Sequence, residues 1–379
     1  MPFARHPAGE ALDCRTIALA RGYRVKPFGR IACLAALISF SAVAENEARL
    51  PEGFADLDAD VQAVILEYLF SNQASQVWGE QAVVPTAHEM VKYLDDFQTR
   101  VLIDFERGNI RVESLGSSQP QAALEHAIAA ILLTPANPEA VDLFTASDFG
   151  ITGRPFLAGQ VLDHEGKAIE YPWRAERFAS YLTAQKMQHQ GNRHWVDIPM
   201  VREHKVVSAK GFGPAIERAA NRYQISPALI LAVIDTESSF NPFAVSPSKA
   251  YGLMQVMSRT AGRDVYEKIY KRSGQPDRSV LLNPDKNIDI GTAYLSILRD
   301  NYLRGVQGAL KQEYCIIAAY NGGTGNLLKA FHSDRKRAVQ RINAMSAEEV
   351  FQTIVRSHPK AESRNYLKKV TKAKARYAS

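Results

Sequence analysis

One short stretch of this chain constrains its fold more than any other: residues 226–255, SPALILAVIDTESSFNPFAVSPSKAYGLMQ. Ser226 followed by Pro227 is typical of an N-cap and the first turn of a helix. The segment from Ala228 to Ile234 is apolar on every side of that helix, so it must be buried. Asn241-Pro242 marks where the helical segment has ended. The chain must therefore build a hydrophobic core around this one helix.

A single carboxyl group follows the apolar run. Glu237 lies on the same helical face as Ile230, Val233 and Ile234. On that face a carboxylate loses water when the chain folds, and the C-terminal end of the helix dipole opposes its charge, so both effects raise its pKa. A raised pKa is what a general acid working near neutral pH needs. For an isolated glutamate the commoner explanation is a residue that simply reaches the surface, so the surrounding motifs decide.

Three motifs follow Glu237 in a fixed order. GLMQ at 252–255 comes after the Ser-Pro-Ser loop at 246–248, AAYNGG occupies 318–323, and ESRNY occupies 362–366. In this order the motifs resemble the goose-type-lysozyme-like domain of the lytic transglycosylases, over roughly Gly211 to the C-terminus. The resemblance implies an all-α, lysozyme-like domain that acts on peptidoglycan strands and needs neither metal nor cofactor. Ser363 and Pro247 vary within the motifs, and neither removes a group that the chemistry uses.

The number of acidic residues bears on the reaction. Most glycosidases use two carboxylates, but residues 238–255 contain none, and Asp235 lies on a different helical face from Glu237. This scarcity favours lytic transglycosylation. The resemblance implies that Glu237 protonates the oxygen between N-acetylmuramic acid and N-acetylglucosamine. It then takes the proton of the muramyl C6 hydroxyl, which closes a 1,6-anhydro ring.

The resemblance also assigns substrate-binding roles to Ser246, Met254, Gln255, Tyr294, Tyr320, Asn321 and Tyr366. Ser246 would place a hydroxyl near the reacting sugar, and Gln255 would bond a sugar N-acetyl or hydroxyl group, with Met254 in the same subsite. Tyr294, Tyr320 and Asn321 would line the groove, and Tyr366 would bond Glu237 and fix its conformation. Plain core packing explains Met254 and Tyr294 equally well.

Two other functions remain open. The same fold could carry a goose-lysozyme-type hydrolase, or an inactive scaffold that binds the cell wall. Masses of the products separate the two enzymes, and turnover of purified sacculi separates both from the scaffold.

Residues 1–44 predict an export signal rather than a folded segment. Lys26 and Arg30 precede the apolar run Ile31–Val43, and Ala42-Val43-Ala44 fits a cleavage site before Glu45. An uncleaved anchor is the alternative. Cys33 begins the apolar run instead of following it, so no lipobox is found, and we expect a periplasmic protein that could lie at the membrane surface. Cleavage would leave Cys315 as the only cysteine, in an apolar run typical of a buried thiol.

Charge divides the chain in two. Residues 45–205 carry 13 basic and 24 acidic residues, whereas residues 206–379 carry 27 basic and 14 acidic residues. The second half therefore has a net charge of +13, which favours a polyanionic partner. For an exported protein that partner is the cell wall, since no nucleic-acid-binding motif is present. A merely solvated basic face is the alternative.

Residues 45–206 predict an α+β accessory domain. The pattern indicates helices at 61–73, 83–97 and 121–133, a hairpin of strands 101–105 and 110–115, and strands at 159–162 and 195–207. No metal-ligand spacing occurs here. The segment 195–223 resembles that of the membrane-bound lytic murein transglycosylase C group, which implies a role in positioning or in contacts with cell-wall proteins.

Residues 207–379 predict the all-α catalytic domain. The expected helices are 214–223, 227–238, one opened by the GLMQ motif, 287–301, 314–320, 346–356 and 360–376.

Overall fold

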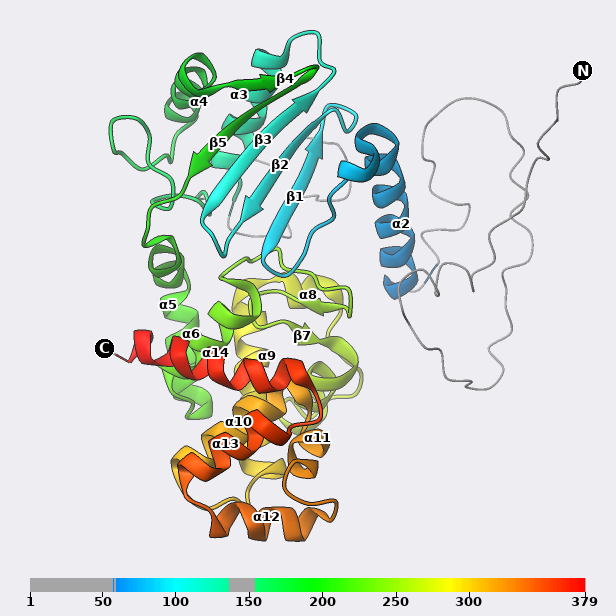
Figure 1. Cartoon of the computed structure of the whole chain (residues 1–379), viewed down its shortest axis with the longest axis vertical. Helices are drawn as coiled ribbons and strands as arrows, with labels where there is room; N and C mark the ends of the chain where they lie inside the picture. The colour runs from blue at the N-terminus through cyan, green and yellow to red at the C-terminus, as the bar shows by residue number, and fades with distance from the viewer. Residues whose placement is uncertain (1–56, 58, 136–153, 379) are drawn as a thin grey trace, which may run out of the picture. The chain divides into compact units, whose positions relative to one another are not determined.

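The computed structural model describes residue 57, residues 59–135 and residues 154–378 (Figure 1). The chain divides into two compact units, residues 1–49 and 50–379, and every described residue belongs to the second. The predicted export signal, its cleavage after Ala44 and the position of Cys33 lie outside the described residues.

The N-terminal part is organised by one antiparallel sheet. Its strands are β1 (Glu89–Leu94), β2 (Thr99–Asp104), β3 (Asn109–Leu115), β4 (Gln188–Gln190) and β5 (Arg193–Pro199), in the order β1-β2-β3-β5-β4. The β2–β3 hairpin is the one that the sequence predicts. The central pairing of β3 with β5, in which Val112 faces Val196, joins residues that are 78 to 90 positions apart in the chain.

Helices cover both faces of this sheet. They are α2 (Ala59–Trp78) with the 3-10 turn η2 (Gly79–Gln81), α3 (Pro120–Leu132) and α4 (Pro172–Lys186). One core joins α3 and α4 to inward residues such as Ile103, Val112 and Val196. A second, aromatic core joins Phe70 and Trp78 of α2 to Val91 and Tyr93 of β1. Successive residues of β1 thus reach opposite faces, as strand geometry requires.

Several predictions for this part are wrong. The predicted helix 83–97 is β1 and its flanking turns, because residues 90–94 are all buried between two cores. Residues 159–162 form only isolated bridges rather than a strand. The strand predicted at 195–207 stops at Pro199, and a helix begins at His204. The helices at 61–73 and 121–133 are confirmed by α2 and α3, whereas α4 was not predicted.

The C-terminal part is helical and adds one small β-ribbon. Its elements are α5 (His204–Tyr223), α6 (Pro227–Ser238), β6 (Ala250–Tyr251), β7 (Val256–Met257), η4 (Ser258–Gly262), α7 (Arg263–Lys268), α8 (Arg278–Leu282), α9 (Pro284–Ile297), η5 (Leu298–Tyr302), α10 (Ala309–Gly322), α11 (Thr324–Lys329), α12 (Arg335–Ala344), α13 (Ala347–Ser357) and α14 (Ala361–Tyr377). Here η4 and η5 are single wide turns of π-helix.

Helix α6 is buried as its composition predicts. Leu229, Ile230, Val233 and Ile234 belong to the helical core, and α6 packs against α5 and α14. Ser226 occupies the N-cap position, but its side chain makes no capping hydrogen bond. The helix ends where Ser239 adopts a left-handed backbone conformation with φ of 53°.

The prediction of an all-α domain needs one correction. The GLMQ motif opens no helix: it forms the turn between β6 and β7, which pair as a two-stranded ribbon. Gly252 (φ 70°) and Gln255 (φ 47°) both lie in the left-handed region, so a right-handed helix cannot run through them.

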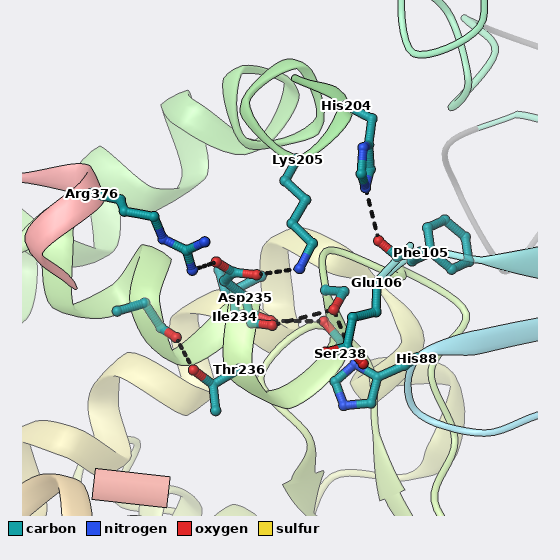
Figure 2. Close-up of polar contacts among 12 residues, drawn as sticks. His88, Phe105, Glu106, His204, Lys205, Ile234, Asp235, Thr236, Ser238 and Arg376 are labelled. Atoms are coloured by element: carbon teal, nitrogen blue, oxygen red, sulfur yellow. Dashed lines mark hydrogen bonds and ion pairs between the residues drawn. The ribbon is translucent and has the colours of Figure 1, made fainter. Parts of the chain in front are cut away.

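The loop after α6 contacts the N-terminal part directly. Phe243 is buried in the core of α3 and α4, and its ring meets that of Phe156 edge-on at 5.2 Å. The Asn241 side chain donates to the carbonyl of Ala87 (3.1 Å), and the His204 ring bonds the carbonyl of Phe105 at 3.0 Å (Figure 2). The segment that carries Glu237 is therefore held from both sides.

Candidate active site

A groove of about 880 Å³ opens beside the end of α6. Its walls come from α6, the loop and ribbon at 246–257, α9, α10, α14 and the residues just before β1. Seven of the eight predicted site residues line this groove: Glu237, Ser246, Gln255, Tyr294, Tyr320, Asn321 and Tyr366. The fold thus gathers groups that are up to 129 positions apart in the chain.

Glu237 has the altered acidity that its position predicts. The pKa of its carboxyl is raised to about 8, mainly by burial and in smaller part by the nearby charge of Glu362, while the Tyr366 hydroxyl partly opposes the rise. No salt bridge to Glu237 forms among the described residues. No cationic side chain there compensates its carboxylate for the water that it loses on folding. At neutral pH this group therefore holds its proton and can donate it to an oxygen placed in the groove.

Tyr366 stands beside this carboxyl. Its hydroxyl is buried and makes no hydrogen bond of good geometry with any described residue. It nevertheless lies close enough to Glu237 to lower the pKa of that carboxyl, which offsets part of the rise caused by burial. The pKa of the Tyr366 phenol is itself raised well above its usual value, first by burial and then by the charge of Glu237. The two groups are neighbours, as predicted, but the predicted hydrogen bond is not fully formed.

Asp235 shows that the other carboxyl of α6 is used differently. Figure 2 shows it between Lys205 and Arg376, whose nitrogens lie 2.9 Å and 2.7 Å from its two oxygens. The Tyr377 hydroxyl donates to it as well, at 3.1 Å. Asp235 does not line the groove, and its three bonds tie α6 to α5 and α14.

A buried asparagine sets the shape of the GLMQ turn. Asn287 of α9 accepts from the Met254 amide (2.8 Å) and donates to the carbonyls of Tyr251 and Leu281. A side chain at Gly252 would come within 2.5 Å of Asn287, so only glycine fits there. The turn directs the Gln255 side chain into the groove, where it donates to the carbonyl of Gly252.

Met254 does not lie where the sequence interpretation placed it. Its side chain is fully buried and packs against Gly291 of α9 rather than lining the groove. The chain reverses direction at this turn, so Met254 and Gln255 point to different sides. Met254 still contributes its carbonyl, which accepts from the Tyr320 hydroxyl at 2.8 Å.

The AAYNGG and ESRNY motifs meet across the groove floor. Asn321 donates to the Glu362 carboxylate (3.0 Å) and accepts from the Ser363 hydroxyl (2.6 Å). This approach needs Gly322, where a side chain would come within 2.6 Å of the Ser363 hydroxyl and 2.5 Å of the His358 ring. The rings of Tyr294 and Tyr320 lie 5.7 Å apart, which makes a continuous aromatic wall.

Ser246 is fixed by its own loop. Its hydroxyl accepts from the Ala250 amide and shares a hydrogen bond of 3.0 Å with Ser248, which also lines the groove. Two hydroxyls therefore face the groove from this loop.

Sequence analysis missed several groove residues. Glu362 belongs to the ESRNY motif, so its presence could have been anticipated from the motif itself. His88 comes from the N-terminal part, where its ring bonds the Ser239 hydroxyl at 3.1 Å. No local pattern marks it, because a residue 149 positions before Glu237 reaches the groove only through the tertiary fold. The basic residues Lys360, Lys368 and Lys369 were missed as well.

The described residues lack two features that would point to other functions. No group of three metal-ligating side chains was found there. No helix in those ranges has the length and apolar character that crossing a membrane requires. Cys315 is buried, and burial raises the pKa of its thiol to about 12, so it is no nucleophile.

Comparison with known proteins decides the family. Residues 56–210 match the family model for the N-terminal domain of membrane-bound lytic murein transglycosylase C, and residues 214–343 match the transglycosylase SLT domain. Membrane-bound lytic murein transglycosylase C of Yersinia pestis (strain Pestoides F) is 44% identical over 319 residues, which cover 83% of this chain and 89% of the relative. The chain belongs to the membrane-bound lytic murein transglycosylase C family.

Other known proteins are also similar to this chain. The membrane-bound lytic murein transglycosylase C of Yersinia pseudotuberculosis serotype O:1b matches with the same identity and coverage. Among solved structures, an inactive mutant of lytic transglycosylase Slt from Pseudomonas aeruginosa is 25% identical, with a TM-score of 0.35. The 70 kDa soluble lytic transglycosylase of Escherichia coli is 28% identical, with a TM-score of 0.34. Both matches cover 44% of this chain and about a quarter of the solved chain.

In this membrane-bound lytic murein transglycosylase C family member, a sheet-containing N-terminal region precedes the helical, lysozyme-like SLT domain. The groove lies in the SLT domain, and Ala87 and His88 of the N-terminal region complete its wall.

Proposed function

We propose that this protein cleaves the bond between N-acetylmuramic acid and N-acetylglucosamine in peptidoglycan and leaves 1,6-anhydro-muramyl ends. One observation carries the proposal: Glu237, with a pKa raised to about 8, faces a groove and has no cationic partner among the described residues. Membership of the lytic murein transglycosylase C family supports the substrate class.

Glu237 performs two proton transfers in this mechanism. As an acid it gives its proton to the glycosidic oxygen, the C1–O bond breaks, and positive charge develops at C1 and the ring oxygen. As a base the resulting carboxylate takes the proton of the muramyl C6 hydroxyl, whose oxygen then bonds C1. The carboxyl returns to its protonated form and no water is consumed. A pKa near 8 suits both steps, because the two protonation states are close in free energy at neutral pH.

The other groove residues position the sugars. Gln255 and Ser246 present an amide and a hydroxyl to N-acetyl and hydroxyl groups, and the aromatic wall of Tyr294 and Tyr320 packs against a sugar face. Asn321 is oriented by Ser363 and Glu362. Tyr366 holds Glu237 in place and stabilises its ionised form.

We also propose the wider setting of this activity. Residues 45–206 form an α+β accessory domain that helps to position the glycan, and residues 207–379 form the catalytic domain. Residues 1–44 direct export to the periplasm, where peptidoglycan is the substrate.

A second reaction deserves a test because Glu362 supplies another carboxyl to the groove. If Glu362 activated water, the same site would hydrolyse the glycan in the manner of a two-carboxylate glycosidase. Its hydrogen bond from Asn321 and its exposure favour an orienting role over that of a base.

Mass spectrometry of digested sacculi distinguishes these reactions. The wild-type protein is expected to release anhydro-muropeptides. Each is lighter by one water, about 18 Da, than the reducing muropeptide that hydrolysis gives. Glu237→Gln should release neither, and Glu362→Gln should leave the anhydro product as the main one. Reducing products from the wild type that vanish in Glu362→Gln would establish the hydrolase instead.

A further inference from the structure

The groove carries a row of basic side chains that the reaction itself does not use. Lys360, Lys368 and Lys369 line it along one side, all from α14 or the residue before it. All three are exposed, and none forms a salt bridge with another described residue. Three exposed lysines along one side of a groove give that side a positive potential, which attracts anionic groups of a ligand.

The row extends beyond the reacting carboxyl in both directions. Tyr366, which contacts Glu237, lies between Lys360 and Lys369 on α14. Lys360 and Lys369 are nine residues apart, about 13 Å along the axis of a helix. Lys369 lies near the N-terminal region, because its charge lowers the pKa of His88. The row therefore follows the groove on either side of the bond to be cleaved.

Negative charge in the groove lining is small. Glu237 and Glu362 are the acidic residues that line the groove among the described residues, and Glu237 is protonated at neutral pH. Glu362, on α14 like Lys368 and Lys369, accepts a hydrogen bond from the neutral Asn321 amide, and its one carboxyl can balance at most one of the three lysines. The basic row is therefore not neutralised by the groove wall, and an anionic ligand group would be attracted to it.

The ligand chemistry follows from the substrate. A glycan strand bears a lactyl group on every second sugar, and in intact peptidoglycan that group is amide-linked to a stem peptide with several free carboxylates. These carboxylates stand away from the sugar ring, where long lysine side chains on the rim of a groove can reach them. The sugar backbone itself is neutral and gives lysines nothing to pair with.

We propose that Lys368 and Lys369, with Lys360, bind the carboxylates of stem peptides and make this protein selective for peptide-bearing glycan over denuded glycan. The inference rests on the proposed function, since it names the stem peptide as the part of the substrate that the same groove recognises. The lysines act on binding and have no part in the proton transfers.

Two substrates from one preparation test this selectivity. Intact sacculi carry stem peptides, and the same sacculi treated with an N-acetylmuramoyl-L-alanine amidase keep the glycan but end each lactyl group in a free carboxylate. The measured quantity is the initial rate at which new glycan ends appear, at equal glycan concentration, for the wild type and for the double variant Lys368→Gln/Lys369→Gln. Lys372→Gln is the matched control, because Lys372 is exposed on the next turn of α14 and does not line the groove.

The double variant should lose about fivefold to tenfold of its rate on intact sacculi, since one exposed ion pair corresponds to at most about fivefold. Its rate on denuded glycan should change less than twofold, and Lys372→Gln should match the wild type on both substrates. Equal losses on the two substrates would overturn the proposal in favour of general attraction to lactyl carboxylates. An unchanged rate on intact sacculi would overturn it outright.

These outcomes remain separate from the fate of the proposed function. A wild-type protein that cleaves neither substrate contradicts the function and the inference together. A wild-type protein that cleaves both with anhydro products, and whose preference the double variant leaves unchanged, contradicts the inference alone.

Discussion

The sheet of the N-terminal region and the groove of the SLT domain each remove a glutamate from much of its water, and they treat it in opposite ways. Glu113 of β3 is fully buried but lies 2.6 Å from Arg100, and Arg193 bonds its other oxygen. Arg100 in turn stacks on Trp78 with 3.7 Å between its guanidinium carbon and the ring centroid. Glu237 of α6 has no such partner among the described residues, and its pKa rises to about 8.

The difference shows what each carboxyl is for. A buried carboxyl that is paired with cationic side chains ties elements together, whereas Glu237, which has no such partner, keeps its proton at neutral pH and can transfer it. The same difference occurs within a single helix. Asp235 is two residues from Glu237, and yet it forms salt bridges with Lys205 and Arg376. Pairing, rather than burial alone, separates structural from reactive carboxyls in this protein.

The largest expected effect comes from removing the unpaired carboxyl. Glu237→Gln keeps the shape of the side chain but cannot donate a proton, so turnover of sacculi should fall by about 10² to 10⁴. The measurement is release of soluble muropeptides, alongside binding of the variant to intact sacculi, which should persist. Turnover within twofold of the wild type would remove Glu237 from the mechanism.

The same substitution in the sheet should affect stability instead. Glu113→Gln leaves Arg100 and Arg193 without their carboxylate beside a buried face, which should cost about 3–5 kcal/mol of unfolding free energy. Urea denaturation followed by circular dichroism measures this cost. The fraction that remains folded should turn over sacculi at the wild-type rate, and a large loss of turnover per folded molecule would break the contrast between the two regions.

The pH dependence of stability should sharpen the contrast further. In the unfolded chain Glu237 ionises near pH 4.5, whereas in the folded protein it holds its proton up to about pH 8. Its contribution is therefore complete below pH 4.5, declines as the pH rises, and is lost once the pH passes 8. Relative to Glu237→Gln, the wild type should lose up to a few kcal/mol between pH 5 and pH 9. Thermal unfolding of both proteins across this range measures the difference, and parallel curves would contradict the raised pKa.

Much of the helical domain could be predicted because its signals are local. The apolar run from Ala228 to Ile234 dictates a buried helix wherever it is placed, and α6 has the predicted bounds of 227–238. The helices predicted at 346–356 and 360–376 also correspond to α13 and α14. Seven of the eight predicted site residues line one groove for a related reason, since the motifs that carry them stand on these helices and their connections.

The remaining features depend on contacts between distant segments. The alternation in β1 is hidden because both of its faces are buried, so residues 83–97 resembled a helix. Met254 was misplaced because the turn that buries it is held by Asn287, 33 positions further on. His88 reaches the groove from the position just before β1, a strand that no local pattern revealed. A single sequence without long-range pairing cannot supply these facts.

The smallest expected effect concerns the hydroxyl beside Glu237. The Tyr366 hydroxyl is buried and makes no hydrogen bond of good geometry with a described residue, so Tyr366→Phe should leave the unfolding free energy within about 1 kcal/mol of the wild type. Yet the hydroxyl lowers the pKa of Glu237, so it must stabilise the ionised form that acts as the base. Its loss should reduce turnover by roughly tenfold, because the carboxylate that forms during the reaction would lose a polar group that stabilises it.

A pH profile distinguishes this role from simple packing. Without the hydroxyl the pKa of Glu237 should move further upward, so the alkaline limb of the turnover profile should shift to higher pH in Tyr366→Phe. A packing defect would lower turnover equally at every pH and would lower stability with it. Tyr320 provides the matched control, because its hydroxyl already bonds the Met254 carbonyl, and Tyr320→Phe should lower stability without moving the alkaline limb in the same direction. An unshifted limb in Tyr366→Phe would mean that the hydroxyl has no effect on the pKa of Glu237. Burial without a cationic partner, in contrast to the arginine-paired Glu113, would then explain the raised pKa by itself.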